Sequence, residues 1–351
     1  MAERAIDIQG RPVGDGAPCF IIAEAGVNHN GDLDLARELI DVAAAVGADA
    51  VKFQSFKAAD LVTADAPKAA YQKRTTGEEQ SQFEMLRRLE LSEEAHVELI
   101  DHCRRKRITF LSTPFDERSA DLLERLGVPA YKIPSGEMTN LPLLAHIARK
   151  RLPMVVSTGM CNLSEVETAV DCLEKCGLRD LVLLHCVSNY PADPADVNLR
   201  AMQTMRTAFG YPVGYSDHTQ GDAVGLAAVA LGACVVEKHF TLDRKLPGPD
   251  HQSSLEPGEL AQFVRSVRAV EAALGTGRKR PAPCEVDTAA VVRKSLVAAC
   301  DLPAGTVLTE SCVASRRPGT GLPPGMRPHI LNRKLRTGVP AGTLLDLEML
   351  S

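Results

Sequence analysis

The sequence predicts an α/β protein: a (β/α)8 TIM barrel followed by a small β-rich C-terminal domain. Short apolar, β-prone runs alternate with amphipathic helical segments about eight times before residue 276. No G-x-G-x-x-G turn follows the first of these runs, which disfavours an open, doubly wound sheet. Beyond residue 287 the β-prone runs are short and broken by Gly and Pro, as is typical of a compact β-rich unit.

The barrel elements follow one another along the chain after an opening hairpin, which we expect to turn at Asp15-Gly16. The predicted strands are 19–26, 50–56, 108–115, 130–137, 153–160, 181–191, 212–217 and 234–240. The predicted helices are 34–47, 92–107, 117–127, 141–150, 163–177, 199–210, 223–233 and 257–275. Gly47 suits a helix stop and Ser92 a helix N-cap. The one long interruption of this alternation, 57–91, is polar.

Composition indicates where the barrel ends. Basic residues, prolines and glycines replace the helical pattern between 275 and 287. We therefore expect a barrel domain at 1–276, a linker at 277–287 and the β-rich domain at 288–351. Two similar phrases in this last part, DLPAGTVLT and GVPAGTLLD, suggest an internal repeat of a turn followed by a strand.

Charge and composition exclude several classes of function. The 351 residues carry 40 basic and 45 acidic side chains, spread along the chain, so no nucleic-acid surface is expected. No apolar run approaches the roughly 20 residues that span a membrane, and the N-terminus lacks the apolar core of a signal peptide, so we expect a cytoplasmic protein. The ten cysteines form no C-x-x-C motif and are expected to be buried, reduced thiols.

Polar side chains occur at the end of every predicted strand, where a TIM barrel carries its active site. Lys52 and Lys132 together with several hydroxyls predict an anion site, most simply for phosphate. His218 and His239 end neighbouring strands and predict a divalent metal site. Singly, each residue also has a structural interpretation: a strand lysine can extend past the core, and a hydroxyl can cap the next helix. His185, inside an apolar run, is expected to be a core histidine.

The motifs in order resemble those of the sialic acid synthase family. They are AEAGVNHNG, VKFQSFKA, STPFD, YKIPSGE, STGM, LLHCVSNYP, GYSDHT, EKHFTLD, PGPD and RRPGTG, and they run nearly from end to end of the chain. The resemblance implies condensation of phosphoenolpyruvate with an N-acylated mannosamine-type sugar to a nine-carbon 2-keto acid. It also implies a C-terminal SAF (antifreeze-like) domain and a domain-swapped homodimer, with no nucleic-acid or membrane partner.

The resemblance assigns roles to matching residues. His218 and His239 are the implied ligands of Mn²⁺ or Mg²⁺. Positions around the phosphate and carboxylate of phosphoenolpyruvate are Lys52, Thr113, Lys132, Ser135, Ser157, Ser188 and Ser216. Positions near the metal, the reacting carbons or the sugar hydroxyls are Glu24, Gln54, Glu137, Tyr190 and Asp250, of which Glu24, Glu137 and Asp250 are the catalytic candidates. Arg317 matches an arginine that the partner subunit extends over the sugar.

Two products fit this family pattern. N-acetylneuraminate, made from N-acetylmannosamine, is the first expectation. The alternative is N,N′-diacetyllegionaminate, made from 2,4-diacetamido-2,4,6-trideoxymannose. More remote alternatives are a metal-dependent pyruvate aldolase, which leaves the paired lysines unexplained, and a non-catalytic carbohydrate-binding protein, which leaves the barrel histidines unexplained.

Overall fold

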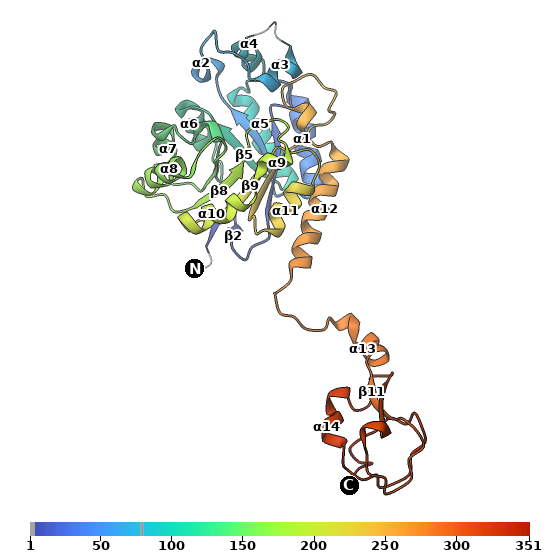
Figure 1. The fold of residues 1–351 in the computed structure, drawn as a ribbon. Helices are drawn as coiled ribbons and strands as arrows, with labels where there is room; N and C mark the ends of the chain where they lie inside the picture. The colour runs from blue at the N-terminus through green and yellow to red at the C-terminus, as the bar shows by residue number, and fades with distance from the viewer. Residues whose placement is uncertain (1–3, 78, 80) are drawn as a thin grey trace. The chain divides into compact units, whose positions relative to one another are not determined.

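The computed structural model describes residues 4–77, 79 and 81–351, and it divides into two compact units (Figure 1). The first unit ends at Gly275 and the second runs from Thr276 to Ser351. Among the described residues, no helix is long and apolar enough to cross a membrane.

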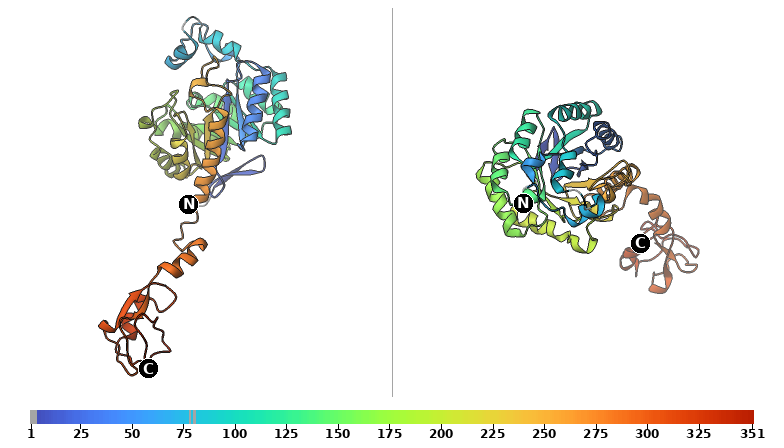
Figure 2. Two further views of the ribbon diagram at one scale, coloured as in Figure 1. Left: turned by 90° about the vertical axis from the view of Figure 1, so that its right-hand side faces the viewer. Right: turned by 90° about the horizontal axis from the view of Figure 1, so that it is seen from above.

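The first unit is a (β/α)8 barrel, as the sequence predicts. Its eight parallel strands are β3 Phe20–Gly26, β4 Ala50–Ser55, β5 Thr109–Pro114, β6 Tyr131–Ile133, β7 Met154–Ser157, β8 Leu181–Cys186, β9 Val213–Asp217 and β10 Val235–His239. Their order around the sheet is β5-β4-β3-β10-β9-β8-β7-β6, and contact between β5 and β6 completes the ring (Figure 2). The first and last strands in sequence, β3 and β10, are thereby neighbours in space.

An outer ring of helices covers the strands (Figure 2). These are α1 Leu33–Ala45, α5 Glu93–Lys106, α6 Glu117–Arg125, α7 Leu141–Ala148, α8 Leu163–Lys175, α10 Arg200–Phe209, α11 Ala223–Ala230 and α12 Pro257–Leu274. Ser92 caps α5 by accepting from the Ala95 amide, as expected. Because both faces of each strand are buried, the strands read as continuous apolar runs. One face meets the helices and the other fills the barrel.

A hairpin precedes the barrel, but its turn was wrongly placed at Asp15-Gly16. The strands β1 Ala5–Ile8 and β2 Arg11–Gly14 are joined at Gln9 and Gly10, both of which have positive φ. Two-residue hairpin turns favour such backbone, and Gly supplies it without strain. Asp15 lies after β2, where its amide donates to the Arg4 carbonyl. Ile6, Ile8 and Val13 of the hairpin pack against the apolar barrel interior.

The polar interruption at 57–91 is partly helical. It contains α2 Ala58–Leu61, α3 Ala70–Thr76 and α4 Gln82–Arg88, and Ser81 with Glu84 forms a capping box at the start of α4. Met85 and Leu89 pack with Val27 and Phe56 in a small cluster separate from the main core. Each helix has seven residues or fewer, so no helical periodicity marks it in the sequence.

The second unit is small and β-rich. It contains η3 Pro283–Glu285, α13 Val286–Val292, β11 Ser295–Ala298, η4 Glu310–Cys312, β12 Val313–Arg316, η5 Pro324–Met326 and α14 Arg327–Ile330. β11 and β12 pair antiparallel. The repeated phrases of the sequence meet in space, because Leu302 of one bridges Val339 of the other. Gly305 and Gly342, at equivalent places in the two phrases, have φ of 82° and 84°.

All ten cysteines are free, but the expectation that they are buried is only partly right. Cys19, Cys103, Cys186 and Cys234 are buried, whereas Cys284 and Cys300 are exposed. The two exposed thiols lie in the second unit, where a core of this size covers less of the chain.

Candidate active site

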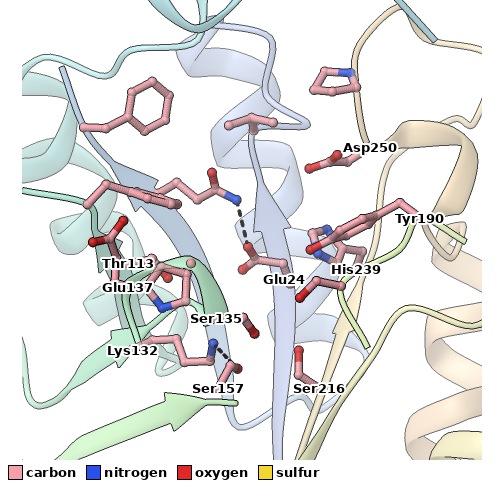
Figure 3. Close-up of a pocket in the computed structure, with 18 of the residues that line it drawn as sticks. Glu24, Thr113, Lys132, Ser135, Glu137, Ser157, Tyr190, Ser216, His239 and Asp250 are labelled. Atoms are coloured by element: carbon pink, nitrogen blue, oxygen red, sulfur yellow. Dashed lines mark hydrogen bonds between the residues drawn. The ribbon is translucent and has the colours of Figure 1, made fainter. Parts of the chain in front are cut away.

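A cavity of about 340 Å³ opens at the carboxyl ends of the barrel strands. Every predicted site residue except Arg317 lines it. Figure 3 shows Thr113, Lys132 and Glu137 on one side, Tyr190, His239 and Asp250 on the other, and Glu24 between them. Arg317 belongs to the second unit, where its Nε donates to the Val292 carbonyl at 3.0 Å.

Strand alternation decides which strand-end residues reach the cavity. On β10, Glu237 and His239 line the cavity, whereas Lys238 between them faces the opposite way. The Lys238 ammonium lies 2.7 Å from the Asp217 carboxylate, and both side chains are almost fully buried. This pair therefore belongs to the layer between the strands and the helices.

Two lysines meet around Glu237, which was missing from the sequence-predicted site. Lys132 Nζ lies 3.4 Å from one carboxylate oxygen of Glu237, and Lys52 Nζ lies 3.6 Å from the other. Ser216 Oγ donates to the same carboxylate at 2.9 Å. The signal for Glu237 was its place two residues before His239 on one strand, because alternate residues share a face.

The lysines also contact the predicted hydroxyls. Lys52 donates to Thr113 Oγ1 at 3.0 Å and lies 3.0 Å from Glu24 Oε1. Lys132 donates to Ser157 Oγ at 2.8 Å. Ammonium groups beside several hydroxyls, all buried, suit an anion with many oxygens.

The two buried carboxyl groups have opposite pKa shifts. Burial raises the pKa of Glu24 to about 7, against the opposing effect of Lys52. Burial also disfavours the charged form of Glu237, but Lys132 and Lys52 outweigh it and lower the pKa of Glu237 to about 2. At neutral pH, Glu237 is ionised while Glu24 exchanges a proton, a division typical of catalytic carboxylate pairs.

Two serine hydroxyls lie against the backbone of Gly159, a residue that was not among the predicted site residues. Its amide donates to Ser135 Oγ at 2.9 Å. A Cβ at this position would lie 2.4 Å from Ser188 Oγ and 2.7 Å from Ser135 Oγ. Only glycine therefore allows both serines to stay in place, and Lys132 with Ser157 completes this part of the cavity.

The two histidines lie side by side, with ring centroids 5.3 Å apart. His218 Nδ1 donates to the Val187 carbonyl at 2.7 Å, which leaves its Nε2 as the acceptor nitrogen. His239 Nδ1 is buried, and no described group forms a hydrogen bond with it. Burial, reinforced by His218, holds the pKa of His239 well below its usual value, so this imidazole is neutral. The Tyr190 ring packs 4.1 Å from the His218 ring, centroid to centroid.

These features fit a metal held by few protein groups. A neutral imidazole and an unpartnered buried nitrogen are the form in which histidine binds a divalent cation. In the described part of the chain, no cluster of three or more His, Cys, Asp or Glu side chains is arranged to hold a metal. The two imidazoles are the groups that could hold a metal here, with Asp250 lining the same cavity.

The loop that carries Asp250 is fixed by hydrogen bonds from distant segments. Ser254 Oγ donates to the Asp250 carbonyl at 2.7 Å and accepts from Asn28 Nδ2 at 3.0 Å. Thr75 Oγ1 donates to the Pro249 carbonyl at 3.3 Å. Burial raises the pKa of Asp250 to about 6. The carboxyl group is thus built into the cavity, beyond the role of a turn residue.

Other predicted positions are less central. Glu137 is half-buried, and its Oε2 accepts from Asn140 at 2.7 Å. Gln54 donates to Glu24 Oε1 at 3.3 Å. His185 does not line the cavity; its Nε2 bonds to the Val197 carbonyl at 2.5 Å, which agrees with the structural role expected for it.

One side of the cavity is apolar, and this side was not predicted from the sequence. It is formed by Val27, Phe56, Leu61, Val62, Met85, Leu86, Leu89 and Phe115, and we call this set the apolar wall. Most of the wall comes from the interruption at 57–91. The lysines, hydroxyls and histidines come from the strand ends instead.

The chain is similar in sequence and in structure to proteins of one known family. Residues 39–279 match the NeuB family, and residues 293–351 match the SAF domain. The chain is 51% identical over 342 residues to the N,N′-diacetyllegionaminic acid synthase of Legionella pneumophila, covering 96% of each chain. It is 52% identical over 305 residues to the same-named synthase of Campylobacter jejuni, covering 86% of this chain and 91% of that one. A crystal structure of N-acetylneuraminic acid (sialic acid) synthetase from Leptospira borgpetersenii, with citrate, is 37% identical with a TM-score of 0.72, covering 82% and 95%.

Proposed function

The chain belongs to the NeuB family, and from this premise we propose that it condenses phosphoenolpyruvate with an N-acylated amino sugar. The products are a nine-carbon 2-keto sugar acid and phosphate. The observation that carries the proposal is one cavity in which two buried lysines and a set of hydroxyls lie beside two neighbouring imidazoles. An aldolase that uses pyruvate has no phosphate for these lysines to bind.

For the sugar, we propose 2,4-diacetamido-2,4,6-trideoxymannose and hence N,N′-diacetyllegionaminate as the product. This reverses the preference for N-acetylneuraminate in the sequence analysis. Two synthases named for N,N′-diacetyllegionaminic acid are 51% and 52% identical to the chain, against 37% for the sialic acid synthetase. The motifs quoted from the sequence are common to both activities and therefore do not distinguish the two sugars. The proposed sugar is supported by overall sequence identity instead.

His218 and His239 would hold a divalent cation, Mn²⁺ or Mg²⁺. When bound, such a cation supplies Lewis acidity to the sugar aldehyde. The neutral state of the His239 ring and its unpartnered buried Nδ1, judged over the described residues, support this assignment. Asp250 faces the same part of the cavity and can accept a hydrogen bond from the sugar.

The remaining residues act on phosphoenolpyruvate. Lys52 and Lys132, with the serine and threonine hydroxyls, would bind its phosphate and carboxylate. When the C3 carbon of phosphoenolpyruvate bonds to the aldehyde carbon, positive charge develops at C2. The ionised Glu237 carboxylate lies where it can stabilise such charge.

Water then adds to C2, and the C2–O bond to phosphate breaks to leave the ketone; one proton of the water ends on the former aldehyde oxygen, which becomes a hydroxyl, and the other leaves with phosphate. A group has to take the proton of the water and return one to a departing oxygen. We propose Glu24 for this role because its pKa of about 7 allows both states at neutral pH. Glu137 is more exposed and faces Asn140, which makes it the weaker candidate.

Arg317 would complete the site from the second subunit of a homodimer, as the family resemblance implies. A mixed-mutant experiment tests this. Chains carrying Arg317→Ala and chains carrying His218→Ala should each be inactive alone, and activity should return when the two are unfolded and refolded together. An inactive mixture would contradict exchange between subunits.

The activity itself is tested by incubating the protein with phosphoenolpyruvate, Mn²⁺ and either sugar. Phosphate release and the mass of the product are the readouts. We expect rapid formation of the legionaminate product and slower turnover of N-acetylmannosamine. No phosphate release with either sugar would overturn the proposed function, and faster turnover of N-acetylmannosamine would overturn the choice of sugar.

A further inference from the structure

The cavity is polar at its floor and apolar along one side of its upper part. Lysines, carboxylates and imidazoles at the strand ends form the floor. Leu61, Val62, Met85 and Leu86 of the apolar wall come from α2 and α4 and the residues that follow them. This chain therefore encloses its substrate with two surfaces of different chemistry.

The side chains of the apolar wall are available to a ligand. Met85 and Leu89 are buried and anchor the wall to Val27 and Phe56. Leu61, Val62 and Leu86 are only half-buried, although they line the cavity. When a ligand covers half-buried aliphatic groups with apolar surface, removal of that surface from water favours binding.

The reaction fixes which end of the sugar meets this wall. The aldehyde carbon has to reach phosphoenolpyruvate beside Lys52, Lys132 and the histidines on the floor. The opposite end of the open-chain sugar, from C4 to C6, then extends away from the floor. The lining that the segment 57–91 supplies there consists of residues of the apolar wall together with the amide side chains of Gln72 and Gln82.

We propose that the apolar wall is the specificity surface for the C6 methyl group of a 6-deoxy sugar. This inference rests on the proposed function and adds to it the residues that select the sugar. A C6 methyl group covers Val62 and Leu86 without losing a hydrogen bond. A C6 hydroxyl loses water against the same carbons, and the two amide side chains of 57–91 that line the cavity already bond to each other, with Gln82 Nε2 donating to Gln72 Oε1 at 3.4 Å.

The test compares two sugars that differ at one atom: 2,4-diacetamido-2,4,6-trideoxymannose and its 6-hydroxy counterpart. The quantity measured is the ratio of their kcat/KM values, from phosphate release at saturating phosphoenolpyruvate and Mn²⁺. We expect the unmodified chain to favour the 6-deoxy sugar by roughly tenfold to a hundredfold, the range that apolar pockets reach against an added hydroxyl.

Two wall variants change polarity at nearly constant shape, Val62→Thr and Leu86→Asn. Each should lower the ratio by roughly fivefold or more, mainly through KM for the 6-deoxy sugar, while KM for phosphoenolpyruvate stays unchanged. Leu86→Met keeps an apolar side chain of similar volume and should keep the ratio. Arg87→Gln, an exposed change on the same helix, is the matched control.

The outcomes separate the two claims. Product from the unmodified chain, with a ratio that neither Val62→Thr nor Leu86→Asn alters, would overturn the wall as a specificity surface and leave the proposed function standing. No product from either sugar would overturn both. If Leu86→Asn fails to fold, Val62→Thr still tests the role of the wall, because threonine has nearly the same shape as valine.

Discussion

Substitution of the buried ion pair Lys238–Asp217 can test whether residues on the outer face of β9 and β10 contribute to stability and not to catalysis. Lys238 lies between two cavity residues in sequence, yet its ammonium contacts the Asp217 carboxylate at 2.7 Å and the Thr219 carbonyl at 2.5 Å. Replacing Lys238 by Met leaves the Asp217 charge buried without its counter-charge. We expect this to destabilise the barrel and to leave the chemistry of the folded protein intact.

The magnitude follows from the distance and the burial. Two unit charges 2.7 Å apart attract by roughly 6 kcal/mol at an effective dielectric constant of about 20. Part of this attraction offsets the cost of desolvating both groups. Removing one partner of such a buried pair typically costs about 3–5 kcal/mol. That is a large fraction of the roughly 5–15 kcal/mol that stabilises a domain.

The assay is urea denaturation of the barrel transition, followed by circular dichroism, with kcat/KM measured on the folded protein. Lys238→Met should lower the free energy of unfolding by about 3–5 kcal/mol and leave kcat/KM within about twofold. The double variant Asp217→Asn, Lys238→Met should recover at least half of the loss. It removes the uncompensated charge, while the amide oxygen still accepts from the Thr219 amide and hydroxyl.

Two results would refute this reasoning. If Lys238→Met lowers the free energy of unfolding by less than about 1 kcal/mol, the buried pair contributes no more to stability than an exposed salt bridge. If the double variant is no more stable than Lys238→Met, the unpaired Asp217 charge is not the cause of the destabilisation. A matched change on the inner face, Lys132→Met, should do the opposite by abolishing turnover.

Three further predictions concern the cavity. His218→Ala and His239→Ala should each abolish turnover and Mn²⁺ binding by calorimetry while circular dichroism stays unchanged; activity retained without metal would contradict their role. Gly159→Ala should raise KM for phosphoenolpyruvate by roughly tenfold or more by displacing the Ser135 hydroxyl, and an unchanged KM would exclude this part of the cavity from substrate binding. Because burial raises the pKa of Asp250 from 3.8 to about 6, the carboxyl stays protonated longer in the folded state, and its contribution to stability is lost as pH rises through that range. The stability of the unmodified chain relative to Asp250→Asn should therefore fall by roughly 2 kcal/mol between pH 4 and pH 7, and a pH-independent difference in urea titrations would contradict the shift.

Much of the barrel could be predicted because its strands are short, apolar and buried on both faces. All eight strands and their outer helices were located from this pattern alone. The hairpin turn was misplaced because Gln9-Gly10 is a weaker turn signal than Asp15-Gly16, and only pairing between Ala5 and Gly14 decides between them. The helices within 57–91 were missed because their order comes from contacts with Val27 and Phe56, which are distant in sequence.

The sequence predicted many of the residues that line the cavity, but it did not predict which charged side chains contact one another there. Motifs at strand ends named both lysines and both histidines. They did not separate Glu237 from Lys238, which are adjacent in sequence and face opposite sides of the sheet. Gly159 was missed because its role depends on the hydroxyls of two other strand ends, whose approach a sequence does not display.

The division of labour between Glu24 and Glu237 arises from this spatial arrangement. Both carboxyl groups face Lys52, at 3.0 and 3.6 Å, so this contact alone cannot set their pKa values apart. Glu237 also faces Lys132 and accepts from Ser216, whereas Glu24 has only the Gln54 amide as a further donor among the described residues. The extra cation and the extra hydrogen-bond donor keep Glu237 charged, whereas burial raises the pKa of Glu24 to about 7. Two identical side chains can thereby supply the fixed negative charge and the proton carrier that the proposed function needs, because different strands adjoin them.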